Sequence, residues 1–507
     1  MERYICIHGH FYQPPRENPW TGTVEQQSSA SPYHDWNERI TAECYASNAS
    51  SPILDGDGQV VRALNNYARM SFNFGPTLLS WMERHKPDVY HAIIEADRVS
   101  RKRFSGHGSA IAQIYNHMIM PLANQRDKKT QAIWGVADFQ KRFGRSPEGM
   151  WLPETAVDLE TLEVLAEVGV KFTILAPHQA RKVKLIGQVE WHDVSGGKID
   201  PTRAYLCPLP SGRSMNIFFY DGPIAVDVAF GNLLNNGELF AKRLHQAFRD
   251  TSDWSQIVHI ATDGETYGHY HRHGDMALAY CFHTIERDSL ARLTNYGEYL
   301  QRCPPTHAVE IVEKSSWSCA HGVERWRDDC GCHSGSHPGR RQAWKKTLRE
   351  AMDWLGERLA AVYEEEAALY LREPWEARDD YIEVMLDRGP DRVERFLQRH
   401  AARKLSGQER EKVFKLLEMQ KHAMLVYTSC GWFFDEISGI EAVQVMRYGA
   451  RAMELAEEVT GTELEPEYVR MLAAAPSNVD GNGAAVYDLF VKRPRANPLP
   501  GVAPENR

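Results

Sequence analysis

Short apolar runs that end in polar clusters, with helical stretches between them, constrain the fold of this sequence most. Four such runs are Tyr4 to Ile7, Val170 to Leu175, Met215 to Tyr220 and Ile257 to Ala261. The residues from Leu159 to Val168 have helical spacing and precede one of these runs, which is typical of parallel strands joined by right-handed crossovers. Polar residues that repeatedly follow apolar strands favour an α/β barrel with its site at the carboxyl ends of the strands.

A chain of 507 residues is too long for one ordinary domain. We expect a catalytic barrel with long site loops over residues 1–342. From about Ala343 the sequence is rich in Ala, Leu, Glu, Arg and Lys with helical spacing, which predicts an α-helical bundle over residues 343–475. Residues 476–507 are rich in Pro, Gly and Asn, and we expect them to form a tail.

The composition indicates which binding partners and which cellular compartment to expect for this protein. The formal net charge is -9 and the basic residues are scattered, so neither nucleic acid nor a membrane is expected as a partner. The first residues lack the basic start and apolar core of a signal peptide. The nine cysteines are an odd number and lie mostly singly in apolar surroundings. We therefore expect a reduced, cytoplasmic protein, with its oligomeric state left open.

Two carboxylates stand out as candidate catalytic groups. Glu154 follows the apolar run and proline of Met150-Trp151-Leu152-Pro153, where a strand must end. It has an alternative interpretation as the cap of a helix starting near Thr155. Asp263 follows the strand Ile257 to Ala261, and its alternative interpretation is a turn residue, because Asp-Gly is a turn dipeptide. Two carboxylates that face one pocket are the minimal equipment for cleaving a glycosidic bond.

Several short motifs recur at the ends of the apolar runs over the first two-thirds of the chain. The first three are His8-Gly9-His10-Phe11-Tyr12-Gln13-Pro14, Trp151 to Glu154, and Asp263 to Glu265 with Tyr267-Gly268-His269. The others are Gln113 to His117 with Met120 to Leu122, Ile174 to Gln179, Phe218 to Asp221, and Ser316 to Gly322. These motifs resemble those of glycoside hydrolase family 57 and occur in that family's order. Each motif is a weak signal alone, and the ordered set is a strong one.

The resemblance implies a (β/α)₇ barrel with an attached helical domain, and a retaining enzyme that acts on α-glucans or maltooligosaccharides without a cofactor or a metal. It makes Glu154 the nucleophile and Asp263 the acid/base. Glu265 would help by raising the pKa of Asp263 through like-charge repulsion. The expected substrate-binding residues are His8, His10, His117, Trp151, Asp221, Glu265, His269 and Trp317.

Two parts of the sequence depart from the family pattern. The segment from Gly106 to Ile111 lacks the acidic residue that many members have there. The segment from Tyr427 to Glu436 is dense in aromatic and acidic residues, and packing against the barrel is a safer expectation for it than a contribution to the cleft. The residues from His10 to about Asp57 have little periodicity, and we expect a long loop over the site.

Two other functions must be weighed. A metal-dependent polysaccharide deacetylase would use an Asp and two His, and His269, His271 and His273 alternate near Asp263. The segment Cys330-Gly331-Cys332-His333 adds only half of a zinc site, because paired spacings at four positions are expected. A glucan-binding protein without activity is the second alternative, and two converging acids argue against it.

Within the glycosidase interpretation, hydrolysis and glycosyl transfer share one covalent intermediate. They differ in whether water or a sugar hydroxyl attacks it. The sequence favours an amylase-type hydrolase slightly, and leaves 4-α-glucanotransferase and branching activities open.

Overall fold

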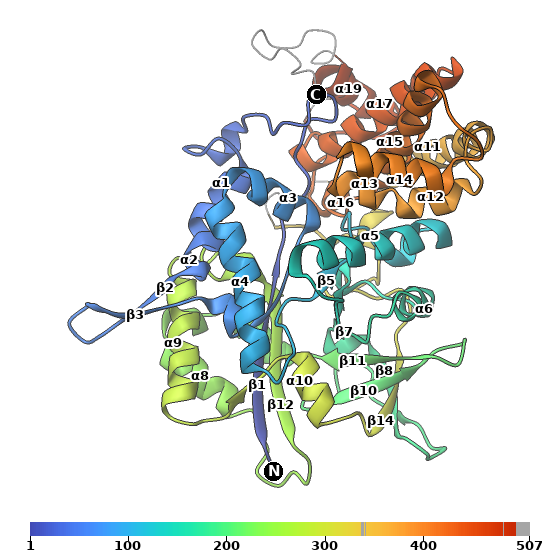
Figure 1. The fold of residues 1–507 in the computed structure, drawn as a ribbon. Coiled ribbons are helices and arrows are strands. Elements are labelled where there is room, and N and C mark those ends of the chain that lie inside the picture. The colour runs from blue at the N-terminus through green and yellow to red at the C-terminus, as the bar shows by residue number, and fades with distance from the viewer. Residues whose placement is uncertain (336–338, 340, 480, 493–507) are drawn as a thin grey trace. The chain divides into compact units, whose positions relative to one another are not determined.

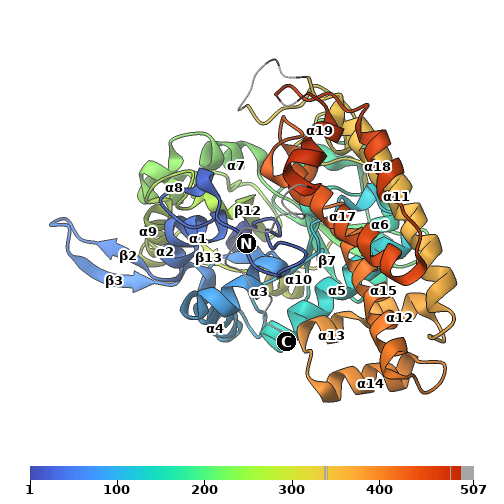
Figure 2. The ribbon, with the colours of Figure 1, turned by 90° about the horizontal axis from the view of Figure 1, so that it is seen from above.

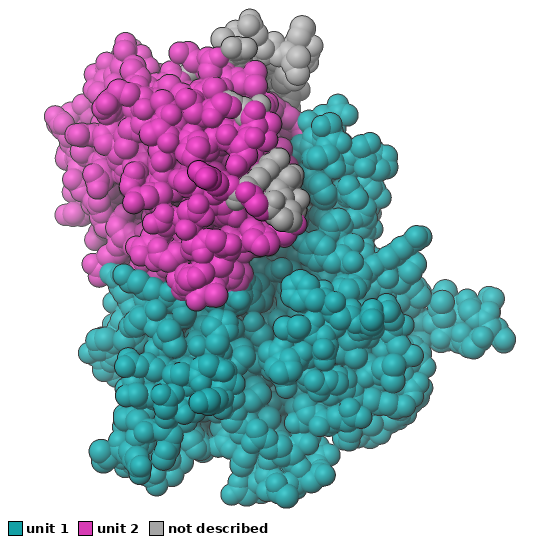
Figure 3. Space-filling view, turned by 180° about the vertical axis from the view of Figure 1, so that it is seen from behind, with its two compact units in different colours: residues 1–13, 26–115, 138–317 teal, residues 14–25, 116–137, 318–507 magenta. Residues whose placement is uncertain are grey.

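The computed structural model describes residues 1–335, 339, 341–479 and 481–492. These residues divide into two compact units, which Figure 3 shows in different colours. Unit 1 contains residues 1–13, 26–115 and 138–317, and unit 2 contains residues 14–25, 116–137 and 318–507. Helix α5 (Gln125–Phe143) contributes residues to both units. None of the helices in the described part of the chain has the length and hydropathy that crossing a membrane requires.

Unit 1 is built on a closed ring of parallel strands. In ring order these are β1 (Arg3–Phe11), β4 (Ser71–Phe74), β5 (Ala112–Gln113), β6 (Met150–Trp151), β7 (Phe172–Leu175), β11 (Ser214–Phe219) and β12 (Gln256–Asp263). Strand β1 pairs in parallel with both β4 and β12, β5 with β6, and β7 with β11. Parallel bridges join Phe72 to Ala110 and Gly149 to Phe172. The amide of Asp221 donates to the carbonyl of His259 at 2.8 Å, which links β11 to β12 and closes the ring.

The ring strands are continuous apolar runs because both of their faces are covered. Tyr4, Ile5 and Ile7 of β1 are each 0% exposed, and β12 is buried up to Thr262. A glycine is needed where β6 approaches β7, because a Cβ at Gly149 would lie 2.3 Å from the ring of Phe172. Strands and helices alternate around the ring as the sequence predicts (Figure 1).

Helices, 3₁₀ turns and the π-turn η2 connect the ring strands or follow the last of them. The α-helices of unit 1 are α1 (Trp36–Ile40), α2 (Ala46–Ala49), α3 (Pro76–His85), α4 (Pro87–Arg103), α6 (Leu159–Glu167), α7 (Gly222–Ala229), α8 (Gly237–His245), α9 (Gly274–Arg287) and α10 (Tyr296–Arg302). The short turns are η1 (Ser28–Ala30), η2 (Thr41–Tyr45), η3 (Asn66–Ala68), η5 (Pro153–Thr155), η6 (Pro177–Gln179), η7 (Leu233–Asn235) and η8 (Gly264–Thr266).

Further strands extend the ring. Strand β13 (Arg292–Leu293) pairs with the start of β1. Beside β11 lie β10 (Ala204–Pro208), β14 (His307–Ile311), β8 (Ala180–Leu185) and β9 (His192–Asp193), in that order. The hairpin of β2 (Ser51–Leu54) and β3 (Val60–Leu64) extends away from the rest of unit 1 in both Figure 1 and Figure 2.

The expectation of a long loop up to about Asp57 is wrong for its second half. Helix α1, the π-turn η2 and helix α2 follow one another from Trp36 to Ala49. Helix α1 is capped by Asp35, whose side chain accepts from the amide of Glu38. Each element has four or five residues, and the π-turn shifts the helical register between α1 and α2, so no single apolar periodicity reveals them.

Unit 2 is mostly helical. Its elements are η4 (Met120–Leu122), η9 (Glu324–Trp326), α11 (Trp344–Ala367), α12 (Pro374–Asp380), α13 (Ile382–Leu386), α14 (Pro390–His400), α15 (Gly407–Leu425), α16 (Cys430–Phe433), α17 (Ile440–Thr460), α18 (Glu465–Leu472), α19 (Gly483–Tyr487) and η10 (Asp488–Lys492). The long helices α11, α15 and α17 pack against one another (Figure 2). Helix α19 lies within the expected tail, of which residues 480 and 493–507 are outside the described residues.

Candidate active site

Glu154 lies at the carboxyl end of β6, in the turn η5 that Pro153 starts. Its backbone is left-handed, with φ 58° and ψ 20°, and Thr155 after it has φ 51°. A residue other than glycine in this region costs about 1–2 kcal/mol. The helix-cap interpretation of Glu154 is wrong, because α6 begins at Leu159 and Asp158 caps it by accepting from the amide of Thr161. The Glu154 side chain therefore has no role in starting that helix, and capping does not explain the left-handed backbone at this residue.

Trp317 holds Glu154 in place. Its indole Nε1 donates to Oε2 of Glu154 at 3.0 Å, and its amide donates to the Glu154 carbonyl at 3.0 Å. Trp151 meets Trp317 edge to face, with ring centroids 5.1 Å apart. The rings of His8 and His10 also stack on Trp151, each with centroids 4.9 Å apart. Aromatic packing and one charge-assisted hydrogen bond thus fix both the position and the direction of the carboxylate.

A hydrogen-bond network joins the histidines of β1 to β4 and β5. The side chain of Asn73 accepts from His8 Nε2 at 3.1 Å and donates to His10 Nδ1 at 2.9 Å and to Gln113 Oε1 at 2.8 Å. His8 Nδ1 lies 3.0 Å from Ser71 Oγ. Burial lowers the pKa of His8 to about 3, so its ring is neutral. Because Nδ1 of His10 is an acceptor, the neutral ring of His10 carries its proton on Nε2.

Asp263 ends β12, next to the end of β1, where it is paired in register with His10. Asp263 precedes the 3₁₀ turn η8, which begins at Gly264 without a positive φ, so the turn itself does not require a glycine there. Gly264 is required for a different reason: a Cβ there would lie 2.2 Å from the ring of Phe11. The Asp-Gly pair thus lies at a turn, as its alternative interpretation predicts, and it also brings the end of β12 close against β1.

The electrostatic surroundings of Asp263 favour its protonated form. Its side chain is exposed, but the protein around it removes much of its hydration, and this desolvation is the largest cause that raises its pKa well above the usual range. The negative charges of Glu265 and Glu154 add to the rise. Tyr220, which is buried nearby, has its pKa raised by burial and by the charge of Asp263, so its hydroxyl keeps its proton.

Glu265 is buried, with 4% of its surface exposed. Its Oε1 accepts from the amide of Tyr12 at 3.0 Å and from the hydroxyl of Tyr45. Burial raises the pKa of Glu265 to about 7, although both hydrogen bonds act in the opposite direction. This carboxyl thus changes its charge near neutral pH beside Asp263.

The remaining expected site residues have other partners. Asp221 caps α7 by accepting from the amide of Ile224 at 3.0 Å. The ring of His269 hydrogen-bonds Glu43, which also pairs with Arg39 at 3.0 Å. His117 belongs to unit 2, where its Nδ1 lies 2.6 Å from Ser429 Oγ.

The alternating histidines do not form a metal site within the described residues. His271 Nε2 lies 2.9 Å from the carbonyl of Ala229, while His269 faces Glu43. His273 has φ 65° and precedes α9. In the described part of the chain, the group of side chains close enough to hold a metal is elsewhere, at Cys319, His321, Cys330 and Cys332.

Asn73 and Tyr45 of the site network are not singled out from the sequence, and Gln113 appears there only as the first residue of a family motif. Asn73 and Gln113 connect the β1 histidines, and Tyr45 binds Glu265. Asn73 and Gln113 each lie in or at the end of a short apolar run. A polar residue within an apolar strand is therefore the sequence feature by which both could be predicted. Tyr45 carries no such signal, because its partner is 220 residues away.

A model of the family described as "Glycosyl hydrolase family 57" matches residues 33–312, which is more than half of the chain. The chain belongs to glycosyl hydrolase family 57. Residues 341–503 match a second model, described as a domain of unknown function (DUF3536). The family's predicted fold, an α/β barrel followed by a helical domain, is confirmed by the ring of unit 1 and the helices of unit 2.

Two curated α-amylases are similar to parts of the chain. That of Pyrococcus abyssi is 19% identical over 263 residues, which is 49% of this chain and 36% of the relative. "Alpha-amylase 1" of Dictyoglomus thermophilum is 25% identical over 107 residues, 21% of this chain and 15% of the relative. The chain thus spans about a third or less of the length of these relatives.

Solved structures resemble almost the whole chain. An exo-type maltose-forming amylase from Pyrococcus sp. ST04 has a TM-score of 0.68 at 14% identity, covering 97% of this chain and 92% of its own. A branching enzyme from Thermococcus kodakaraensis has a TM-score of 0.57 at 14% identity, covering 94% and 93%. These likenesses establish the fold that the two units share with family members.

Proposed function

We propose that this protein is a retaining glycosidase that acts on α-glucans, with Glu154 as the nucleophile and Asp263 as the acid/base. The observation that carries the proposal is the pairing of these two carboxylates at the ends of β6 and β12. They lie within electrostatic reach of each other, since the charge of Glu154 raises the pKa of Asp263. Two neighbouring carboxyl groups with different proton affinities are the usual equipment for glycoside cleavage with retention.

The residues around them fit the two steps of the reaction. Ionised Glu154 attacks the anomeric carbon while Asp263 gives its proton to the departing glycosidic oxygen. Asp263, now a carboxylate, removes a proton from the incoming water or sugar hydroxyl, and the bond to Glu154 breaks. The indole of Trp317 steadies the oxygen of Glu154 throughout, and Tyr220 stays protonated next to Asp263.

The β1 network suits the recognition of sugar hydroxyls. Asn73 fixes the tautomer of His10 so that its Nε2 is a donor. A neutral donor binds hydroxyl groups without adding a positive charge to the site. A positive charge there would stabilise the ionised form of Asp263 and lower its pKa. Glu265 is buried and holds two protein hydrogen bonds, so we assign it to tuning Asp263 and not to contacting the sugar.

Changing Glu265→Gln is expected to move the alkaline limb of the kcat/KM profile to lower pH by about one unit. Glutamine keeps the size of the side chain and an oxygen that can accept from Tyr12 and Tyr45. It removes the negative charge that favours protonated Asp263, so the acid loses its proton at lower pH. The measurement is the pH dependence of hydrolysis of a maltooligosaccharide.

The control for this variant is Glu190→Gln, which removes an equal charge from an exposed position. Its profile is expected to match that of the unchanged protein. An alkaline limb that stays in place in Glu265→Gln, or moves to higher pH, would contradict the tuning role of Glu265.

Incubation with maltooligosaccharides and amylose, followed by product analysis, tests the proposed function. We expect shorter sugars of retained anomeric configuration, observed by NMR before mutarotation. Oligosaccharides longer than the substrate would instead identify a transferase, and new α-1,6 linkages a branching enzyme. Products of inverted configuration would overturn the two-step mechanism.

A further inference from the structure

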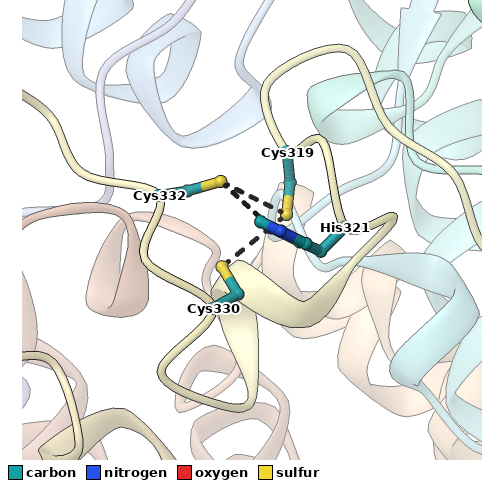
Figure 4. A group of neighbouring side chains, drawn as sticks. All are labelled: Cys319, His321, Cys330 and Cys332. Carbon is teal, nitrogen blue, oxygen red and sulfur yellow. Dashed lines mark hydrogen bonds between the residues drawn. The ribbon is translucent and has the colours of Figure 1, made fainter.

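Four side chains with metal-binding atoms converge in unit 2, on the segment from Ser318 to Ser334 (Figure 4). One ligand atom from each of Cys319, His321, Cys330 and Cys332 lies within 4.8 Å of all the others. The Sγ atom of Cys319 is 3.9 Å from that of Cys330 and 3.9 Å from that of Cys332. His321 Nδ1 is 3.6 Å from the Cys332 sulfur.

These separations fit a shared ion. Bonds of about 2.3 Å from zinc to sulfur and about 2.0–2.1 Å to nitrogen, in a tetrahedron, place two sulfurs about 3.8 Å apart and a sulfur and a nitrogen about 3.6 Å apart. A disulfide requires sulfurs at about 2.05 Å. All three cysteines are free thiols in the structure. The cluster therefore has the dimensions of a tetrahedral metal centre without any rearrangement of its sulfurs.

The local sequence explains how the four side chains meet. Cys319 and His321 are separated by one residue, as are Cys330 and Cys332. Gly331 between the second pair has φ 80°, a left-handed conformation that favours glycine and turns both thiols the same way. The sequence predicts only half of a site, from Cys330 to His333, and the structure adds the pair Cys319 and His321 while His333 is not among the four converging side chains.

Hydrogen bonds within unit 2 hold the segment at both ends. The guanidinium of Arg325 donates to the carbonyl of Phe433 at 2.9 Å and to that of Ser318 at 3.2 Å. After the second cysteine pair, Ser334 donates to Asp435 from its amide at 3.0 Å and from its hydroxyl at 2.7 Å. Asp435, which follows α16, thus fastens the end of this segment.

The charge around the cluster suits a metal with three thiolates. One divalent cation bound to three thiolates and a neutral imidazole leaves a net charge of about -1. Arg325 and Lys345 are buried cations, at 4% and 0% exposed, and Lys345 is within electrostatic reach of Cys330. The Lys345 ammonium has no hydrogen-bond acceptor among the described residues. An anionic centre would compensate both charges.

We propose that Cys319, His321, Cys330 and Cys332 bind one Zn²⁺ in a closed structural site that stabilises this segment of unit 2. Thiolate and imidazole ligands in a tetrahedron select zinc over the oxygen-binding cations. Four protein ligands leave no position for substrate, so the ion has no part in glycoside cleavage. The segment lies between the stretches that match the two family models, residues 33–312 and 341–503. This inference does not depend on the proposed function.

Elemental analysis of the full chain tests the proposal. Protein produced with added zinc and purified under reducing conditions is expected to hold about one zinc per chain. Cys330→Ser and Cys332→Ser are each expected to lose most of it. The matched controls are His333→Ala, whose ring is adjacent but bonds the amide of Gly335, and Cys303→Ser in unit 1. Both controls are expected to retain the metal.

Cobalt binding by the unchanged chain gives a readout that does not depend on variants folding. Metal-free protein titrated with Co²⁺ is expected to develop thiolate-to-metal absorption and the intense visible bands of a tetrahedral site, and zinc is expected to abolish both. Wild-type protein without zinc and without these bands would overturn the proposal. So would a Cys319–Cys330 disulfide found by mass spectrometry of unreduced protein, or full zinc content in Cys332→Ser.

Discussion

Replacing Glu154 with glutamine is expected to lower kcat on maltooligosaccharides by about 10⁴-fold or more, because the amide cannot attack the anomeric carbon. The amide oxygen still accepts from the indole of Trp317, and the left-handed backbone at this position is strained equally in both proteins. Binding of glucan is therefore expected to change little. The two measurements are single-turnover kinetics and the affinity for a maltooligosaccharide.

Rescue by azide distinguishes a variant that lacks only its nucleophile from a variant whose active site is misfolded. In Glu154→Gly, a small anion can enter the space of the missing carboxylate and attack the same face of the sugar. We expect azide to restore turnover of an α-glucosyl fluoride and to yield the glycosyl azide of inverted configuration. Unchanged turnover in Glu154→Gln would remove Glu154 from its proposed role, and would favour a protein that binds glucan without this chemistry.

Asp263→Asn is expected to lower turnover of glucans by about 10²–10⁴-fold, because the glycosidic oxygen then leaves without a proton. The loss should depend on the leaving group. Fluoride departs from an α-glucosyl fluoride with little help from an acid, so the first step with this substrate is expected to be nearly unaffected. Transient kinetics with both substrates measures the difference.

The same variant also distinguishes the two carboxylates. Azide is expected to attack the glycosyl intermediate on Glu154 in Asp263→Asn and to give the azide of retained configuration, opposite to the product of Glu154→Gly. Equal losses on glucan and on the fluoride would contradict the acid/base assignment of Asp263.

The strands and helices that frame these carboxylates could be predicted because their signals are local. The apolar runs at Met215 and Ile257 correspond to β11 and β12, and the helical spacing from Leu159 corresponds to α6. The raised pKa of Asp263 was also expected from Glu265, although desolvation contributes more than that neighbour. Desolvation depends on how the whole ring packs, and no local pattern measures it.

Other features of the structure could not be predicted from the sequence, because they depend on contacts between residues far apart in the chain. Tyr45 reaches Glu265 from a segment expected to be a loop, since short helices there are held by distant partners and not by periodicity. The four metal-binding side chains come from two pairs whose meeting depends on Gly331 and on anchoring by Arg325 and Asp435. Likewise, the sequence placed His8 among substrate contacts, whereas both of its ring nitrogens bond to Ser71 and Asn73.

The left-handed backbone at Glu154 has a consequence for laboratory evolution of this protein. Glycine or asparagine adopts that conformation more readily than glutamate, so either would relieve part of the strain. A library sorted only for heat resistance would then enrich those residues at position 154 and discard the carboxylate that we propose as the nucleophile. Thermostable forms of the enzyme must for this reason be sorted on sugar release and on melting temperature together.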